Sequence, residues 1–206
     1  MDAVVSELGY LRAPMKTDEP RVRAPLTKAI LEVLERQPRD VQVAVRARAK
    51  VEITRVEECS RVDWIPLGVQ LAILDGVREE LGIHGYEDFC AAHFASTVEQ
   101  PFVRGMFDTT VRLFGLGPAA VLRVFPKTWA TISQGCGEVV IEEIDPNGTI
   151  IRVRELPVSE PRIELFVQGF RATFRGIIDL FRRPGDVELV SYDRVMRESV
   201  YRAVWS

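Results

Sequence analysis

The sequence holds few of the residues from which metal sites and disulfide frameworks are built, with only 3 cysteines and 2 histidines among 206 residues. Cys59, Cys90 and Cys136 are odd in number, lie far apart and form no CxxC pair. This pattern argues against both a disulfide framework and a zinc site. We therefore expect three free thiols that behave as small hydrophobic side chains.

Long apolar runs and an excess of basic residues are also lacking. The longest apolar stretches are a few residues, whereas a membrane-spanning helix needs about 20, and residues 1–10 do not resemble a signal peptide. The 27 Lys and Arg residues face 30 Asp and Glu residues, for a net charge of −3, and the basic run over residues 46–50 is typical of a solvated face. We predict cytoplasmic localisation, no membrane span and no nucleic-acid partner.

Motifs of the common enzyme classes are missing as well. No P-loop, HExxH or GxSxG pattern occurs in the chain. Residues 115–120 match GxGxxA, but a helix is expected before them instead of a strand, and Pro118 removes an amide that would face a phosphate. His93 falls on an apolar helix face without paired carboxylates, so no acid–base pair is recognisable. We predict a protein that is not an enzyme and that uses no cofactor and no metal.

Prolines and glycines divide the N-terminal half into helical segments. Residues 1–24 show little periodicity and are expected to form a loosely ordered arm, followed by a single α+β domain over residues 25–206. Residues 41–54 alternate like a strand but have a composition that suits a helix, so the residues alone leave both open. Apolar residues recur at helical spacing from Pro25 to Pro38, from Pro66 to Gly82, over about 86–98, from Pro101 to Gly115, and from Pro118 to Ile132 with a kink at Pro126.

The C-terminal half has a β-β-α-β-β pattern. Two β-rich runs, 139–144 and 149–156, are joined by Asp-Pro-Asn-Gly, which predicts a hairpin. A long amphipathic helix follows, from a Ser159 cap to about Arg183, and then two more strands over 187–193 and 199–205. The fold class is α+β, a four-stranded antiparallel sheet with one long helix packed on it. Gly169 and Gly176 share one stripe of that helix, which predicts close approach to the sheet.

Several turn and packing segments resemble those of the haem nitric-oxide/oxygen binding fold and its 4-vinyl reductase-type relatives, and are especially similar to haem-less bacterial paralogues. The matching segments are 63–67, Leu81-Gly82, 113–118, Phe125-Pro126, Gly169, Gly176 and 200–205. In that family the early segment is helical, so the resemblance implies a helix over residues 39–57. The resemblance covers about residues 63–206 and concerns the fold more than the function.

The chain departs from this family at the residues that hold haem. The resemblance implies a proximal histidine at about Pro118-Ala119, and none is there. The family also binds the propionates with Tyr-x-Ser-x-Arg on the second strand, whereas residues 151–155 read Ile-Arg-Val-Arg-Glu. The cysteine-rich metal motif of some vinyl-reductase-type domains is likewise missing. We therefore expect no haem.

The remaining functional signal is a set of aromatic and apolar residues in the central helices, which core packing alone could also explain. We predict a non-enzymatic sensor or interaction module that binds a small apolar ligand, a protein partner or a second copy of itself, as in a signalling dimer. The alternative is a haem- or metal-binding gas sensor that uses His93 as its ligand. The candidate ligand-binding residues are Phe102, Met106, Phe114, Leu122, Trp129 and His93.

Overall fold

The computed structural model describes residues 19–100, 103–105, 109 and 117–206. The helices are α1 (Ala24–Leu34), α2 (Arg39–Arg48), α3 (Lys50–Glu58), α4 (Leu67–Glu99), α6 (Pro118–Ile132) and α7 (Ile163–Leu180). The strands are β1 (Arg21–Arg23), β2 (Trp64–Pro66), β3 (Ser133–Gln134), β4 (Glu138–Asp145), β5 (Gly148–Arg154), β6 (Gly185–Asp193) and β7 (Glu198–Trp205). The helix expected from the sequence between Pro101 and Gly115 lies mostly outside the described residues.

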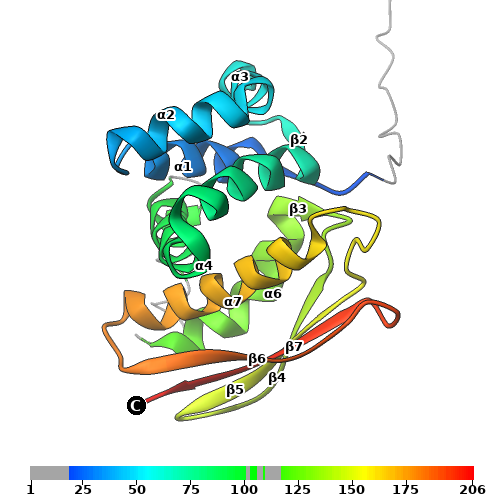
Figure 1. Ribbon diagram of the computed structural model, residues 1–206. Coiled ribbons are helices and arrows are strands. Elements are labelled where there is room, and N and C mark those ends of the chain that lie inside the picture. The colour runs from blue at the N-terminus through cyan, green and yellow to red at the C-terminus, as the bar shows by residue number, and fades with distance from the viewer. Residues whose placement is uncertain (1–18, 101–102, 106–108, 110–116) are drawn as a thin grey trace, which may run out of the picture.

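The C-terminal half forms the predicted four-stranded antiparallel sheet. Its order is β4-β5-β7-β6, so the two hairpins meet through the pairing of β5 with β7. The turn between β4 and β5 is held by the Asn147 amide, which donates to the Asp145 carboxylate at 2.7 Å. Figure 1 shows α7 and α6 in a layer over one face of this sheet, with α4 beyond them and α1, α2 and α3 farthest from the sheet. The predicted β-β-α-β-β arrangement is confirmed.

Helix α7 is packed on two sides. Phe174 meets Tyr201 of β7 edge to face, with ring centroids 5.3 Å apart, so this side of the helix faces the sheet. The glycines do not, and the prediction that they approach the sheet is wrong. A Cβ at Gly176 would lie 3.2 Å from the Ala91 Cα, and one at Gly169 would lie 3.1 Å from the Tyr86 hydroxyl, so both glycines face α4.

The start of α7 also differs from the prediction. The helix begins at Ile163, not at a Ser159 cap, and no side chain caps it. Pro161 explains the delay, because a proline disfavours helical geometry in the residue before it. Residues 157–162 form turns instead, closed by the Glu160 amide on the Pro157 carbonyl at 2.9 Å.

Residues 39–57 form two helices, α2 and α3, separated at Ala49, which has φ −107° and ψ 35°. The helical state agrees with the family resemblance and not with the alternation of valines, but the break at Ala49 was not predicted. Val41 and Val45 of α2, and Ile53 and Val56 of α3, are buried at helical spacing. Val43, the valine between the first pair, is 57% exposed. The apparent strand pattern therefore combines core positions with solvent-facing ones.

Helix α4 contains the break that the sequence predicts at Gly82. Gly82 has φ 69° and ψ −178°, a conformation that favours glycine. The break separates α4 into a first half before Gly82 and a second half after it, which correspond to two of the predicted helices. The second half starts earlier than expected, since residues 83–85 are already helical.

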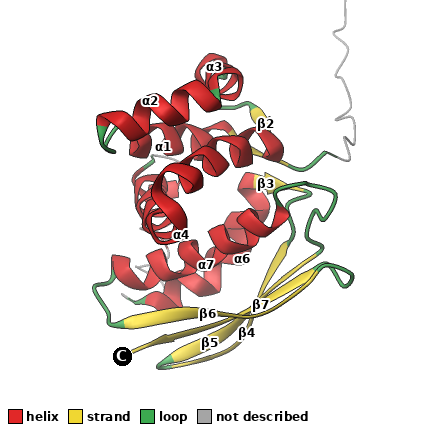
Figure 2. Cartoon of the chain, in the orientation of Figure 1, coloured by secondary structure: helices red, strands yellow, loops and turns green. Residues whose placement is uncertain are grey.

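A small second sheet, β2-β1-β3, was not foreseen (Figure 2). Its central strand, Arg21–Arg23, falls within the expected arm, so the arm prediction is wrong for these residues, while residues 1–18 are not described. Val22 is fully buried. The Leu67 amide donates to the Pro20 carbonyl at 2.8 Å, and the Ala24 amide donates to the Asp63 carbonyl at 3.0 Å. This strand therefore fixes the starts of α1 and α4.

One continuous cluster of buried apolar residues runs from Val22 to Trp205 and includes every helix described. In the part of the chain that the structure describes, no helix combines the length and the hydropathy needed to cross a bilayer.

Candidate functional site

A cavity of about 110 Å³ lies where α4, α6 and α7 meet, closed at one side by Leu26 of α1. This volume is somewhat below the roughly 150 Å³ of a buried apolar cavity that binds benzene. The described residues that line it are Leu26, Gln70, Leu71, Leu74, Tyr86, Cys90, His93, Phe94, Thr97, Val98, Val103, Val121, Val124, Phe125, Thr128, Trp129, Ile132, Phe166, Gly169, Phe170 and Thr173.

The wall formed by α6 and α7 is aromatic. Trp129 and Phe170 meet edge to face with ring centroids 5.0 Å apart, and Phe170 packs in the same way on Phe166 at 4.8 Å. The Trp129 indole N–H donates to the Gly137 carbonyl at 3.1 Å, outside the cavity wall. The polar end of Trp129 is therefore satisfied by the backbone, and this wall presents ring surfaces to a ligand.

The wall formed by the second half of α4 is more polar. Tyr86, Cys90, His93 and Thr97 follow one another at spacings of four, three and four residues, so they share one helix face. The Tyr86 hydroxyl donates to the Leu165 carbonyl at 3.0 Å, and the Thr97 hydroxyl donates to the His93 carbonyl at 2.9 Å. Burial raises the pKa of the Cys90 thiol to about 12 and raises the pKa of Tyr86 well above its usual value, so both groups are uncharged at neutral pH.

His93 is held by α1. Its Nε2 lies 2.8 Å from the Leu26 carbonyl oxygen. Because a carbonyl can only accept, Nε2 carries the proton and Nδ1 is left as an acceptor. Burial lowers the pKa of His93 below its ordinary value, against smaller opposing effects of the Leu26 hydrogen bond and of Glu32. The ring is therefore neutral at pH 7.

Gln70 is the polar residue of the first half of α4 that reaches the cavity. It is only 6% exposed, and its Oε1 accepts a hydrogen bond from the Thr27 hydroxyl at 3.0 Å. Gln70 was not among the predicted site residues. A signal was present, however, because Gln70 shares the apolar face that Leu67 and Leu74 define, three and four residues away.

The predicted site residues are only partly brought together. Trp129 and His93 line the cavity from opposite walls. Leu122 is fully buried but is not one of the lining residues. Phe102, Met106 and Phe114 lie outside the described residues. Phe166 and Phe170 of α7 also line the cavity and were not among the predicted site residues, because their spacing of four places them on one helix face without showing what that face meets.

The described residues do not fit a haem in this cavity. The Nε2 atom of His93 is protonated and bound to Leu26, so it cannot ligate iron in this arrangement. Arg152 of β5 is engaged by two carboxylates, Glu142 at 2.8 Å and Glu198 at 2.7 Å, and is not free to pair with a propionate. The cavity is also several-fold smaller than pockets for drug-sized ligands, about 300–1,000 Å³. Within the described ranges, no cluster of three or more His, Cys, Asp or Glu side chains could hold a metal ion.

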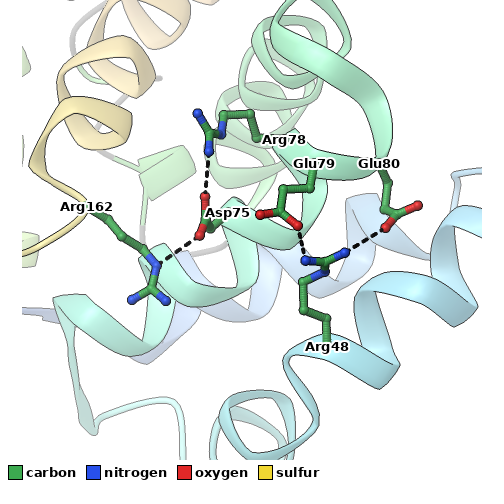
Figure 3. A network of polar contacts seen from close by, with 6 residues as sticks. All are labelled: Arg48, Asp75, Arg78, Glu79, Glu80 and Arg162. Carbon is green, nitrogen blue, oxygen red and sulfur yellow. Dashed lines mark hydrogen bonds and ion pairs between the residues drawn. The ribbon is translucent and has the colours of Figure 1, made fainter.

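Ion pairs tie the first half of α4 to its neighbours (Figure 3). Arg48 of α2 pairs with Glu79 and also with Glu80, the latter at 3.4 Å. Asp75 accepts from Arg162, which precedes α7, at 3.2 Å. The second half of α4 has a more buried counterpart, in which Glu87 pairs with Arg171 of α7 at 2.6 Å. Both halves of α4 are therefore attached to the region around α7.

Comparison with solved structures identifies this arrangement as that of H-NOX domains. An oxygen-binding H-NOX domain related to soluble guanylate cyclases, in its oxygen complex, superposes with a TM-score of 0.63 at 12% identity, covering 89% of this chain and 95% of that one. The Fe(II) unliganded H-NOX protein from K. algicida gives 0.58 at 12% identity, covering 89% and 96%. A Cs H-NOX mutant gives 0.62 at 12% identity, with the same coverage.

The chain therefore has an H-NOX-like fold, as the sequence resemblance implied. No protein-family model matches the sequence, and no curated protein matches it either. At this level of identity the comparison concerns the fold, and the function rests on the site.

Proposed function

We propose that this protein is a non-enzymatic sensor or interaction domain of the H-NOX-like fold that holds a small apolar molecule in the cavity between α4, α6 and α7, without haem. The observation that carries the proposal is the cavity itself, which is lined mostly by apolar side chains and bounded by the rings of Phe125, Trp129 and Phe170. Transfer of an apolar molecule from water into such a space is favourable by roughly 25 cal/mol per Å² of apolar surface buried.

The position of the cavity suits a sensor. Its walls come from α4 on one side and from the α6–α7 layer on the other. A ligand that contacts both walls stabilises the arrangement in which they are packed, by an amount set by its concentration relative to its Kd. We propose that this stabilised arrangement is read by a protein partner or by a second copy of the chain in the cytoplasm.

An enzymatic role is not favoured by the groups in the cavity. Cys90 and His93 lie one helical turn apart, which would suit a nucleophile and a base. However, burial raises the pKa of the Cys90 thiol to about 12, and the protonated Nε2 of His93 is bound to Leu26. A thiol held in its protonated form is a poor nucleophile.

A haem-based gas sensor is the second candidate function. The names of the similar structures favour it, since one is an oxygen-binding domain and another concerns haem distortion in the H-NOX family. The presence of His93 in the cavity wall is the residue-level observation in its favour. Ligation through Nε2 would require the ring to leave the Leu26 carbonyl.

An absorption spectrum separates the two candidates. The protein is to be purified from cells supplied with haem, next to the variant His93→Ala. We expect no Soret band from the parent protein. A stoichiometric band that disappears in His93→Ala would replace our proposal with the haem sensor. Native mass spectrometry of the same sample reports any co-purified molecule and the oligomeric state.

Occupancy of the cavity is tested with toluene as an apolar probe. We expect toluene to raise the Tm of the parent protein and to have no such effect on Val121→Phe, in which the added ring fills the space. Val195→Phe is the matched control, because Val195 is 90% exposed at the β6–β7 turn and should leave the effect of toluene unchanged. An equal response of Val121→Phe and the parent would place toluene elsewhere.

A further inference from the structure

Two polar side chains of the cavity are anchored to neighbouring residues of α1. Gln70, from the first half of α4, is bound through its Oε1 to the Thr27 hydroxyl. His93, from the second half, is bound through its Nε2 to the Leu26 carbonyl. Because Leu26 and Thr27 are consecutive, α1 brings Gln70 and His93 to the same part of the cavity wall. The break at Gly82 lets the two halves of α4 reach this part of the cavity wall from different directions.

Each of these side chains keeps unused hydrogen-bonding capacity. The Nε2 amide of Gln70 has two N–H donors, and the Nδ1 of His93 is an acceptor. Among the residues that the structure describes, neither atom has a hydrogen-bond partner, although Gln70 is more than nine-tenths buried. His93 is half-buried, so both atoms can be reached from the cavity, and a molecule that paired with both would make one hydrogen bond at each.

From this juxtaposition we propose that the cavity takes a small uncharged aromatic alcohol of the phenol type, whose hydroxyl donates to Nδ1 of His93 and accepts from Nε2 of Gln70. This inference rests on the proposed function and adds the chemical class of the ligand. A hydroxyl is the smallest group that donates and accepts through one oxygen, whereas a carbonyl only accepts and an indole N–H only donates.

The rest of the cavity fits the same class. The rings of Trp129 and Phe170 form the opposite wall and offer edge and face contacts to an aromatic ligand. None of the described lining residues carries a full charge at neutral pH, so a carboxylate or an ammonium group would be desolvated without a counter-ion. Because the volume of about 110 Å³ is below the roughly 150 Å³ of a benzene-binding cavity, one ring with a single small substituent is the upper limit for the ligand.

The test compares phenol with toluene, which are of nearly equal size and differ in a hydroxyl against a methyl group. Binding of both is measured by calorimetry to the parent protein, to Gln70→Leu and to His93→Leu. We expect the ratio of phenol affinity to toluene affinity to fall about tenfold or more in each variant. Thr131→Val is the matched control, because Thr131 is an exposed residue of α6 that does not line the cavity and its hydroxyl donates to the Lys127 carbonyl. Its affinity ratio should equal that of the parent.

Toluene binding also reports whether the cavity of each variant is intact, so a variant that fails to fold is recognised by loss of both ligands and is replaced by Gln70→Met or His93→Gln. If toluene binds and the phenol ratio is the same in the parent and in the variants, the inference is overturned while the proposed function stands. If neither compound binds the parent protein, the proposed function fails together with the inference.

Discussion

The two walls of the cavity are built in different ways. The α6–α7 wall rests on the four-stranded sheet and consists of rings that pack on one another, such as Phe170 on Phe174 with centroids 5.7 Å apart. The α4 wall is held by directed polar contacts, among them Gln70 to Thr27 and His93 to Leu26. Apolar packing is non-directional, whereas a buried hydrogen bond fixes an orientation. The α6–α7 wall therefore mainly stabilises the fold, and the α4 wall mainly determines which ligand the cavity accepts.

The largest effect should come from removing β7, one of the two central strands of the sheet. Strand β7 pairs with both β5 and β6, and its Tyr201 and Ala203 are fully buried. Deletion of residues 199–206 leaves two separated strand edges and exposes the underside of α7. We expect insoluble or molten protein, seen as loss of near-UV circular dichroism and of cooperative melting.

The outer side of β7 is expected to contribute less to stability than the side that faces α7. Val204 is 47% exposed, and Val200 is only partly buried, so one face of the strand packs and the other meets solvent. Val204→Thr is therefore the control for the deletion and should melt within a few degrees of the parent. Cooperative melting of the truncated chain at the parental Tm would show that the sheet does not depend on β7.

A smaller effect is expected where the two walls touch. A Cβ at Gly176 would lie 3.2 Å from Ala91 Cα and 3.4 Å from Phe94 Cδ1, so Gly176→Leu forces α7 away from α4. We expect a loss of about 1–3 kcal/mol in the free energy of unfolding, the usual cost of overpacking, measured by urea titration.

Arg175→Leu is the control for this substitution, because the Arg175 side chain is 44% exposed on the same helix. It should change the free energy of unfolding by less than about 0.5 kcal/mol. A Gly176→Leu protein as stable as Arg175→Leu would mean that α7 and α4 are not in close contact.

These glycines show what the sequence could and could not predict. Their spacing indicates a stripe of close approach on α7, and that stripe exists, but periodicity does not say which neighbour fills it. The sheet and α4 were equally compatible with the pattern of Gly169 and Gly176. The four strands and their hairpins were predictable because each signal, such as the Asp-Pro-Asn-Gly turn, is local.

The missed features depend on contacts between distant residues. Strand β1 is 3 residues long and is defined by its pairing with β2 and β3, which no local pattern reveals. Gln70 acquires its position in the site from Thr27, 43 residues earlier. The helices over residues 39–57 were obtained from the family resemblance, since Val43 and Val51 imitate a strand while facing solvent.

The polar wall should respond to pH where the aromatic wall does not. Folding lowers the pKa of His93, so the unfolded chain takes up a proton more readily than the folded one. Stability is therefore complete above the ordinary histidine pKa of about 6.5 and is lost as pH falls from there through the lowered pKa of the folded state. We expect the Tm of the parent to fall more than that of His93→Gln between pH 7.5 and pH 5.5.

His84 provides the matched control for this measurement, because it is exposed on the same helix. The variant His84→Gln should retain the pH dependence of the parent. If His93→Gln and His84→Gln behave alike, protonation of His93 does not weaken the α4 wall.

The smallest effect is expected from the exposed ion pairs that attach the α4 wall to its surroundings. The Arg48 side chain is 50% exposed and that of Glu80 is 29% exposed. Solvent screens such pairs, so Arg48→Ala should cost no more than about 0.5–1 kcal/mol of unfolding free energy, and the difference from the parent should shrink in 1 M salt, where the Debye length is about 3 Å. Arg162→Ala, which removes the contact of Asp75 with the segment before α7, should behave in the same way. A loss above about 2 kcal/mol in the unfolding free energy of Arg162→Ala, unchanged by salt, would contradict this expectation. Polar contacts of α4 would then contribute to stability as strongly as the packing of α7 on the sheet. In that case the two walls could not be distinguished as one that stabilises the fold and one that selects the ligand.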